Sequence, residues 1–152
     1  MEEIKLKEYK IFILERVIDE LQKYKQDNKK KHEAGGILLG QIEGKNIYVM
    51  KISTPNNFDK SSRYSFERNK DIAQIIIDYE FANSNGKTIY IGEWHTHPEN
   101  IPTPSSVDVN MIKDQIRLGK LNEPFALLLI QGIKGMYVGI YKKGELIDEK
   151  RF

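Results

Sequence analysis

Apolar residues recur at steps of three and four in several parts of the chain, which is the spacing of one face of a helix. The pattern predicts three helices, over residues 12–27, 69–82 and 105–118. The first helix is expected to bury Leu14, Val17, Ile18, Leu21 and Tyr24. The second is expected to bury Ile72, Ile75, Ile76 and Tyr79, and the third Val107, Met111, Ile112 and Ile116.

Shorter apolar segments, rich in β-branched and aromatic residues, predict strands between and after these helices. They span residues 36–42, 46–53, 88–94, 125–131, 136–141 and 145–150. The segment 125–131 is apolar at nearly every position, which is typical of a central strand covered on both faces. Residues 58–65 are expected to form a long polar loop. The pattern therefore predicts an α/β or α+β fold: a mixed β-sheet of about six strands with helices packed on it.

Composition places the chain among ordinary globular proteins and indicates one domain over residues 1–152. The 152 residues carry 24 basic and 22 acidic side chains, which is too balanced for a typical nucleic-acid-binding protein. The N-terminus is charged throughout, and no segment has the apolar length of a membrane span. Because there is no cysteine, disulfides and thiolate metal sites are excluded, and a cytoplasmic location is expected.

Two histidines, His95 and His97, directly follow the strand predicted at 88–94. Strand side chains alternate between faces, so these two rings point the same way if the strand continues through them. Two imidazoles on one face, in a chain without cysteine, suit Zn²⁺. A His-x-His pair alone is weak evidence, because most such pairs are ordinary polar or packing residues.

Asp108 supplies a third candidate ligand. Pro98 is expected to end the strand, and Pro102 and Pro104 stiffen the loop that follows. Ser105 then stands where a helix N-cap belongs, so Asp108 falls in the first helical turn and could reach back to the histidines. The Ser105-x-x-Asp108 spacing is equally that of a helix capping box, and both interpretations stay open. Three protein ligands would leave a fourth position for water, which is the arrangement of a catalytic zinc site.

Such a reaction also needs a proton acceptor, and Glu33 is the best candidate. It lies in the stretch HEAGGILLG, where Gly35 and Gly36 permit close backbone approach at the start of a strand. A carboxylate near an attacking water can act as general base and then protonate a leaving amine. Glu33 could instead form a salt bridge. Its neighbour His32 is expected to point away from it, because strand side chains alternate.

Together these residues form a pattern that resembles the JAMM signature of the JAB/MPN metalloproteases. The pattern is Glu33, then His95-x-His97-Pro98, then Ser105-x-x-Asp108. The resemblance covers nearly the whole chain and implies a curved mixed sheet with flanking helices, similar in layering to the cytidine deaminases. It implies that His95, His97 and Asp108 bind one zinc ion. It further implies that Glu33 is the acid/base and that Ser105 helps to stabilise the oxyanion.

The family cleaves isopeptide or peptide bonds after the C-terminal tail of ubiquitin or ubiquitin-like proteins. The stretches HEAGGILLG, SRYSF and GEWHTHPE resemble most closely the small bacterial JAB deconjugating peptidases of CBASS antiphage operons. That resemblance implies that the partner is a cyclic-nucleotide synthase whose C-terminal tail is conjugated to a target protein. Neither nucleic acid nor a membrane is expected as a partner.

Four further residues are candidate substrate contacts: Arg63, Tyr64 and Arg68 in the polar loop region, and Trp94. An extended tail could add as a strand beside this loop. Arg63, Tyr64 and Arg68 could equally be plain surface residues, and Trp94 could belong to the core instead of a groove wall. Glu93 either supports a histidine ring or forms an ion pair.

Other functions remain open at this point. The chain could process a sulfur-carrier or another ubiquitin-like precursor, or it could resemble the JAB proteins associated with DNA repair. It could also be a binding module on an MPN scaffold without activity. A zinc nucleobase deaminase is excluded, because its Pro-Cys-x-x-Cys half needs cysteines that this chain lacks.

Overall fold

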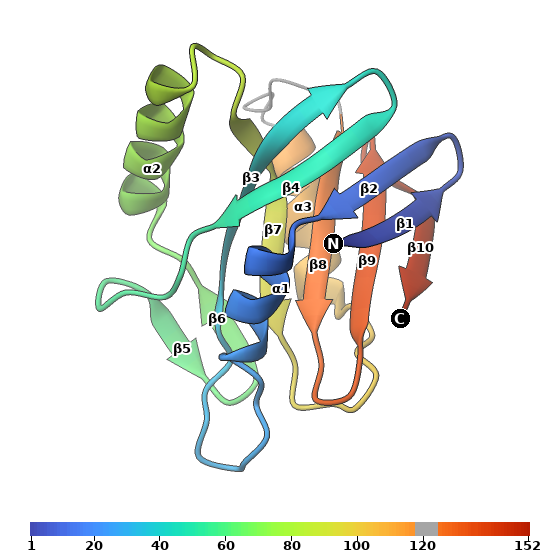
Figure 1. Cartoon of the computed structure of the whole chain (residues 1–152). Coiled ribbons are helices and arrows are strands. Elements are labelled where there is room, and N and C mark those ends of the chain that lie inside the picture. The colour runs from blue at the N-terminus through green and yellow to red at the C-terminus, as the bar shows by residue number, and fades with distance from the viewer. Residues whose placement is uncertain (118–124) are drawn as a thin grey trace.

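The computed structural model describes residues 1–117 and 125–152 and shows one strongly curved mixed β-sheet (Figure 1). In spatial order the strands are β1 (Glu2–Leu6), β2 (Tyr9–Ile13), β4 (Asn46–Ile52), β3 (Gly35–Glu43), β7 (Ile89–Thr96), β8 (Phe125–Gln131), β9 (Met136–Lys142) and β10 (Glu145–Arg151). The pairs β2–β4 and β7–β8 are parallel and the others are antiparallel. The mixed α+β fold with a curved sheet is therefore confirmed.

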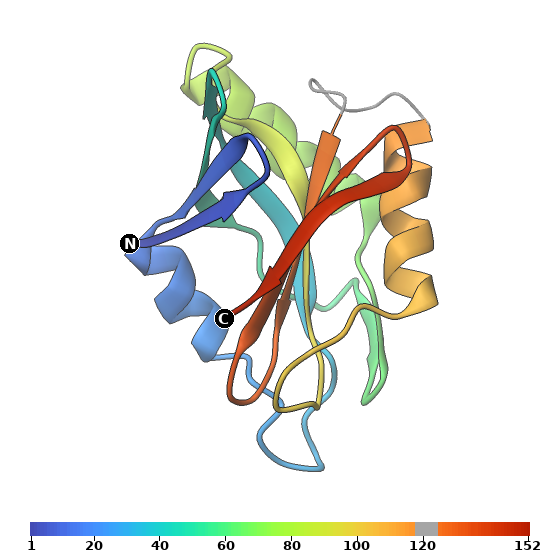
Figure 2. The same ribbon diagram turned by 90° about the vertical axis from the view of Figure 1, so that its right-hand side faces the viewer.

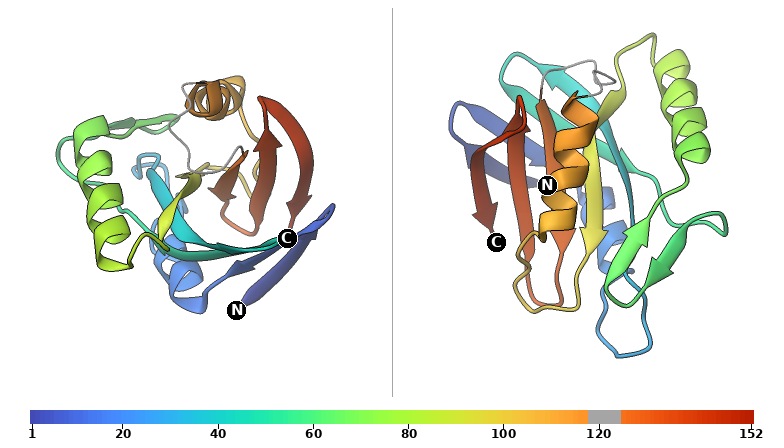
Figure 3. Two further views of the ribbon diagram at one scale, coloured as in Figure 1. Left: turned by 90° about the horizontal axis from the view of Figure 1, so that it is seen from above. Right: turned by 180° about the vertical axis from the view of Figure 1, so that it is seen from behind.

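In the described residues, three helices and a separate hairpin surround the sheet. The helices are α1 (Glu15–Gln22), α2 (Lys70–Asn83) and α3 (Ser106–Arg117), and the hairpin is β5 (Lys60–Ser62) with β6 (Ser65–Glu67). Seen from above, α2 and α3 lie outside the curl of the sheet (Figure 3). The hairpin stands beside the lower end of α3 (Figure 2). Within the described residues, no helix has the length and apolar content needed to cross a membrane.

The prediction of about six strands was too low, because residues 1–117 and 125–152 already place eight strands in the main sheet. The missed pair β1–β2 carries buried side chains at alternating positions: Ile4, Leu6, Tyr9, Ile11 and Ile13. This period of two is the ordinary strand signal, which the many charged residues between these positions obscured. The helix expected from residue 12 consequently begins only at Glu15. The predicted polar loop at 58–65 also contains β5 and the start of β6.

The apolar strand β8 lies between two cores. Its residues Leu127 and Leu129 face the inner core, which lies inside the curl and also receives Val17 and Leu21 of α1. Its alternate residues, Ala126, Leu128 and Ile130, pack under α3 on the outer face. This confirms the prediction of a central strand that is buried on both faces.

Two of the helix faces were predicted correctly only in part. On α2, Ile75 and Tyr79 are 63% and 64% exposed, whereas Ala73 is buried against the sheet with Ile76 and Ile77 beside it. The isoleucines at 75–77 make several faces of this helix equally apolar, so periodicity could not select the buried one. On α3, Ile112 is fully buried but Val107 is 74% exposed, because Val107 lies over the cleft described below. Leu118, the predicted end of this helix, lies outside the described residues.

A β-bulge in β7 decides which face the histidines occupy. In the pairing with β3, Gly92 lies opposite Leu38 and Tyr90 opposite Leu39, so Ile91 is an extra residue. One extra residue reverses the alternation of side chains beyond it. Ile91 and Trp94 therefore both face the inner core, and His95 faces outward under α3. Without the bulge, strand alternation would direct His95 into the core.

Replacing Gly92 by Ala is expected to destabilise the protein strongly. An added Cβ would lie 2.0 Å from the backbone oxygen of Leu127 on the neighbouring strand, so the strands would have to separate. We expect a loss of more than about 2 kcal/mol in the free energy of unfolding, measured by urea denaturation. Gly44→Ala is the control, because its turn position has open space and a φ of +61°, for which about 1 kcal/mol is expected. Equal losses in both variants would contradict this role of the bulge.

Candidate active site

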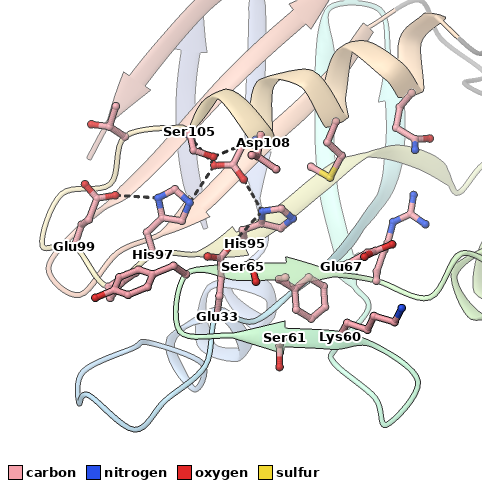
Figure 4. Close-up of a pocket in the computed structure, with 18 of the residues that line it drawn as sticks. Glu33, Lys60, Ser61, Ser65, Glu67, His95, His97, Glu99, Ser105 and Asp108 are labelled. Carbon is pink, nitrogen blue, oxygen red and sulfur yellow. Dashed lines mark hydrogen bonds and ion pairs between the residues drawn. The ribbon is translucent and has the colours of Figure 1, made fainter.

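Four buried polar side chains meet on the outer face of the sheet, beneath the first turn of α3 (Figure 4). His95 and His97 come from the end of β7, Asp108 from α3, and Glu33 from the segment that leads into β3. His97 continues the strand pairing, since its backbone N–H donates to the oxygen of Gln131 at 3.1 Å. The two histidines therefore do share a face, as their spacing predicts.

Asp108 lies between the two imidazoles. Its Oδ1 is 2.9 Å from His95 Nδ1, and its Oδ2 is 3.0 Å from His97 Nε2. Glu33 approaches from the segment just before β3, with Oε1 3.5 Å from His95 Nδ1. One ligating atom each of Glu33, His97 and Asp108 also lies within 4.8 Å of the other two. The structure thus brings together all four residues that the sequence selected.

The Ser105-x-x-Asp108 spacing forms the helix cap that one of its two interpretations predicts. The backbone N–H of Ser105 donates to Asp108 Oδ2 at 2.9 Å, and the N–H of Asp108 donates to Ser105 Oγ at 3.1 Å. This is a reciprocal cap at the start of α3. The cap also holds the Asp108 carboxylate toward the histidines, so helix capping and the cluster use the same side chain.

The donor set fits a divalent metal ion such as zinc. Imidazole nitrogens and carboxylate oxygens are ligand types that zinc takes in proteins, and the cluster offers both within 3.0 Å of each other. On its far side, His97 Nδ1 lies 2.9 Å from Glu99 Oε1, which leaves Nε2 facing the cluster. A carboxylate on the outer nitrogen of a ligating histidine is the usual arrangement around zinc.

Burial and neighbouring charge shift the pKa values of the cluster. Burial raises the pKa of Glu33 to about 7, although the nearby His95 and His97 oppose the shift. Burial alone would lower the pKa of His97, but its hydrogen bond to Asp108 and the charge of that carboxylate raise it to about 9. Burial would raise the pKa of Asp108, but hydrogen bonds from both histidines hold it far below its usual value.

The sequence matches the family described as prokaryotic homologs of the JAB domain over residues 15–142, a range that contains all four side chains. The chain belongs to this prokaryotic JAB family. Two curated relatives, from Escherichia coli and Vibrio cholerae, are both called CD-NTase/cGAS isopeptidase. The E. coli protein is 33% identical over 141 residues, which cover 93% of this chain and 88% of the relative. The V. cholerae protein is 34% identical over 137 residues, which cover 90% and 85% of the two chains.

The fold is also that of a solved structure. The solution structure of protein DSY2949 from Desulfitobacterium hafniense covers 92% of this chain and 89% of its own, with a TM-score of 0.61 and 21% identity. At that level of identity the likeness concerns the fold alone.

In this JAB domain the cluster opens into a cleft of about 850 Å³ between α3 and the β5–β6 hairpin. Val107, Met111 and Gln115 of α3 line one side, and the residues of β6 line the other. Phe66 of β6 contacts the His95 ring edge-on, with centroids 5.9 Å apart. Sequence analysis assigned no role to Phe66 or Glu99, although both lie in stretches that carry the family resemblance. Glu99 does stand two residues after His97, a spacing that could have indicated it.

The four candidate substrate contacts have different positions in the JAB domain. Tyr64 is 74% exposed at the tip of the hairpin and lines the cleft, and Arg63 beside it is half-buried. Trp94 is 0% exposed in the inner core, where its Nε1 donates to the oxygen of Ser53. The prediction that Trp94 contacts substrate was therefore wrong, because the bulge in β7 turns it away from the cleft.

Arg68 lies at the edge of the cleft but is largely engaged by Glu93. Its Nε and Nη2 donate to the two carboxylate oxygens of Glu93 at 2.7 and 3.2 Å, and the hydroxyl of Tyr90 donates to the same carboxylate. Of the two interpretations of Glu93, the structure favours the ion pair. Since the Glu93 side chain is 1% exposed, the pair ties the end of β6 to β7 beneath the cleft.

Proposed function

We propose that this chain is a zinc-dependent isopeptidase that cleaves after the C-terminal tail of a ubiquitin-like conjugate. We further propose that the conjugated protein is the cyclic-nucleotide synthase (CD-NTase) of a CBASS antiphage system. The proposal treats residues 1–152 as a single JAB/MPN domain. The names of the two bacterial relatives support the substrate class.

One observation carries the proposal: Glu33 lies beside the histidines and Asp108 at the edge of an open cleft. Its Oε1 is 3.5 Å from His95 Nδ1, and Glu33, His97 and Asp108 offer ligand atoms within 4.8 Å of one another. One zinc ion would be held by His95, His97 and Asp108. A purely structural zinc site has four protein ligands and is closed to solvent, whereas a site with three leaves room for a reacting group. Zinc, when bound, would supply Lewis acidity that polarises the scissile carbonyl and acidifies water.

Glu33 would move the proton. Its carboxylate lies 3.5 Å from His95 at the edge of the cleft, so it can accept a proton from the attacking water and later release it. The water oxygen forms the new bond to the carbonyl carbon while Glu33 takes its proton. Glu33 then donates that proton to the departing lysine or α-amine as the carbon–nitrogen bond breaks.

Ser105 would stabilise the oxyanion. Its Oγ accepts the hydrogen bond from the backbone N–H of Asp108, so its own hydroxyl proton is directed elsewhere. Ser105 lines the cleft, where that proton can meet the negative charge that develops on the carbonyl oxygen. One such donor contributes about 3 kcal/mol to lowering a barrier.

The cleft suits an extended peptide. β6 pairs with β5 on one edge, and its residues 65–67 line the cleft. A tail that runs between β6 and α3 could add as a strand, with its backbone hydrogen-bonded to β6. Val107 and Met111 would supply apolar contacts on the opposite side. Arg63 and Tyr64 at the hairpin tip are proposed to contact this tail.

Incubation with tail fusions tests the function directly. The substrates are a CD-NTase joined through its C-terminal residue to a reporter protein, and the same reporter fused to a sulfur-carrier protein. We expect cleavage of the CD-NTase fusion at one bond, more than about 100-fold loss with a zinc chelator, and recovery on adding zinc. Mass spectrometry of the products identifies the bond.

The same experiment separates the alternatives. Preferred cleavage of the sulfur-carrier fusion would redirect the substrate assignment to precursor processing. Intact fusions in the presence of one bound zinc ion per chain would support a non-enzymatic scaffold and would overturn the proposal.

A further inference from the structure

A buried glutamine outside the cluster connects three separate segments of the chain. Gln26 lies in the loop between α1 and β3 and is 1% exposed. Its Oε1 accepts a hydrogen bond from Thr96 Oγ1 at 2.9 Å. Its Nε2 donates to the backbone oxygens of Arg63 at 2.8 Å and Lys31 at 3.3 Å. A buried amide with all these bonds made is a rigid connection, and losing them leaves polar groups unpaired.

Thr96 carries this connection to the proposed acid/base. It is the residue between His95 and His97, and its fully buried side chain faces away from them. Its Oγ1 accepts from the N–H of Ala34 at 2.8 Å, and its own N–H donates to the oxygen of Ala34 at 2.8 Å. Ala34 directly follows Glu33, so Thr96 fixes the backbone of the glutamate segment against the strand that carries the histidines.

The hairpin beside the cleft is attached to the same connection. The N–H of Glu33 donates to the oxygen of Ser62 at the end of β5, at 2.7 Å. Gln26 holds the oxygen of Arg63, the next residue, and the guanidinium of Arg63 donates to the oxygen of Asn28 at 3.1 Å. The turn of the hairpin and the backbone of Glu33 are therefore held by neighbouring bonds.

We infer that Gln26, acting through Thr96, is a positioning residue that sets Glu33 and the β5–β6 hairpin relative to the two histidines. The inference rests on the proposed function, since it assigns Glu33 the acid/base role and the hairpin the role of tail-binding wall. A displacement of about 1 Å at a reacting group lowers a rate by about 100-fold, so loss of this connection acts mainly on kcat. The metal ligands take no part in these bonds.

Kinetics of Gln26→Met and Thr96→Val in the zinc-loaded chain test the role. Both changes keep the side-chain volume and remove the polar atoms. With the CD-NTase tail fusion we expect kcat to fall by about 10- to 100-fold in each variant, with one zinc ion still bound per chain. We expect kcat in the double variant to be no lower than in either single variant, because both changes break the same connection. Thr96→Ser, which keeps the hydroxyl, is expected to restore most of the rate.

The matched control is Gln41→Met. Gln41 Nε2 also donates to a threonine hydroxyl, that of Thr88 at 3.1 Å. This bond lies at the other end of the β3–β7 pair, away from Thr96. We expect its kcat to stay within about twofold of the original. The inference would be overturned if Gln26→Met kept the kcat of the original chain, or if kcat fell equally in Gln41→Met.

Hydrogen exchange of the metal-free chain tests the geometry without relying on activity. In Gln26→Met we expect faster exchange of the Glu33 and Ala34 amides together with residues 60–67, and unchanged exchange in β8 and β9. If no fusion is cleaved but this exchange pattern appears, the proposed function fails while the connection stands. Unchanged exchange at Glu33 and Ala34 would overturn the connection itself.

Discussion

Replacing Glu33 by Gln is expected to leave zinc binding intact and to lower kcat on the tail fusion by about 10²- to 10⁴-fold, the range that general acid–base catalysis supplies. Glutamine has nearly the shape of glutamate and can keep the packing beside His95. It cannot accept a proton from water near pH 7, which is what the raised pKa of Glu33 allows the carboxylate to do. Elemental analysis gives the zinc content and a cleavage assay gives kcat, so the two measurements check both expected results.

The control for this variant is Glu43→Gln. Glu43 is exposed at the opposite end of β3, about as far from the cleft as that strand permits. We expect its zinc content and its kcat to match those of the original chain. Full turnover in Glu33→Gln would remove Glu33 from the mechanism. Loss of zinc from Glu33→Gln would instead make Glu33 a ligand.

The second large effect is expected for Asp108→Asn, which should weaken zinc binding by about 10²- to 10³-fold. Structural zinc sites gain about 10–16 kcal/mol from four ligands, so one ligand contributes about 3 kcal/mol. Asparagine still offers an oxygen to the N–H of Ser105 and can keep the cap on α3. The substitution removes the negative charge that both histidines contact, so zinc binding should weaken while α3 stays folded. Titration of the metal-free chain with zinc against a competing chelator gives the affinity.

Asp71→Asn provides the matched control for Asp108→Asn. Asp71 is an exposed carboxylate in the first turn of α2 and therefore has the same relation to its helix dipole as Asp108. Any general effect of removing such a charge should appear in both variants, but only Asp108→Asn should change zinc affinity. Equal zinc affinity in Asp108→Asn and the original chain would show that Asp108 is a cap and not a ligand.

Local patterns were sufficient for much of the fold. The strand β8 was predicted with its observed ends, because an apolar run with no interruption has few alternatives. The strands predicted at 36–42 and 46–53, and at 136–141 and 145–150, leave short gaps between them. Gly44, Lys143 and Gly144 lie in these gaps and have the positive φ that tight turns require. The buried stripe of α1 was also predicted, since Val17 and Leu21 are buried there with Leu14, Ile18 and Tyr24 partly covered.

Long-range packing was needed for the rest. No local pattern shows that α2 carries more apolar residues than the sheet can cover. The exposure of Ile75 and Tyr79 to solvent could therefore not be predicted. The hairpin β5–β6 is short and polar, and it is held by bonds to distant residues such as Glu33 and Gln26 rather than by its own sequence.

The amino-acid sequence establishes which chemical groups this protein has available: two imidazoles at strand spacing, a carboxylate in a helical first turn, a glutamate before a glycine pair, and no thiol. Residue types and spacing along one element are properties of the chain. The meeting of these groups depends on the folded sheet, because they lie on three elements whose contact depends on strand order. The folded sheet also decides that Trp94 faces the core and the histidines the cleft, because the bulge at Gly92 depends on the pairing between β3 and β7.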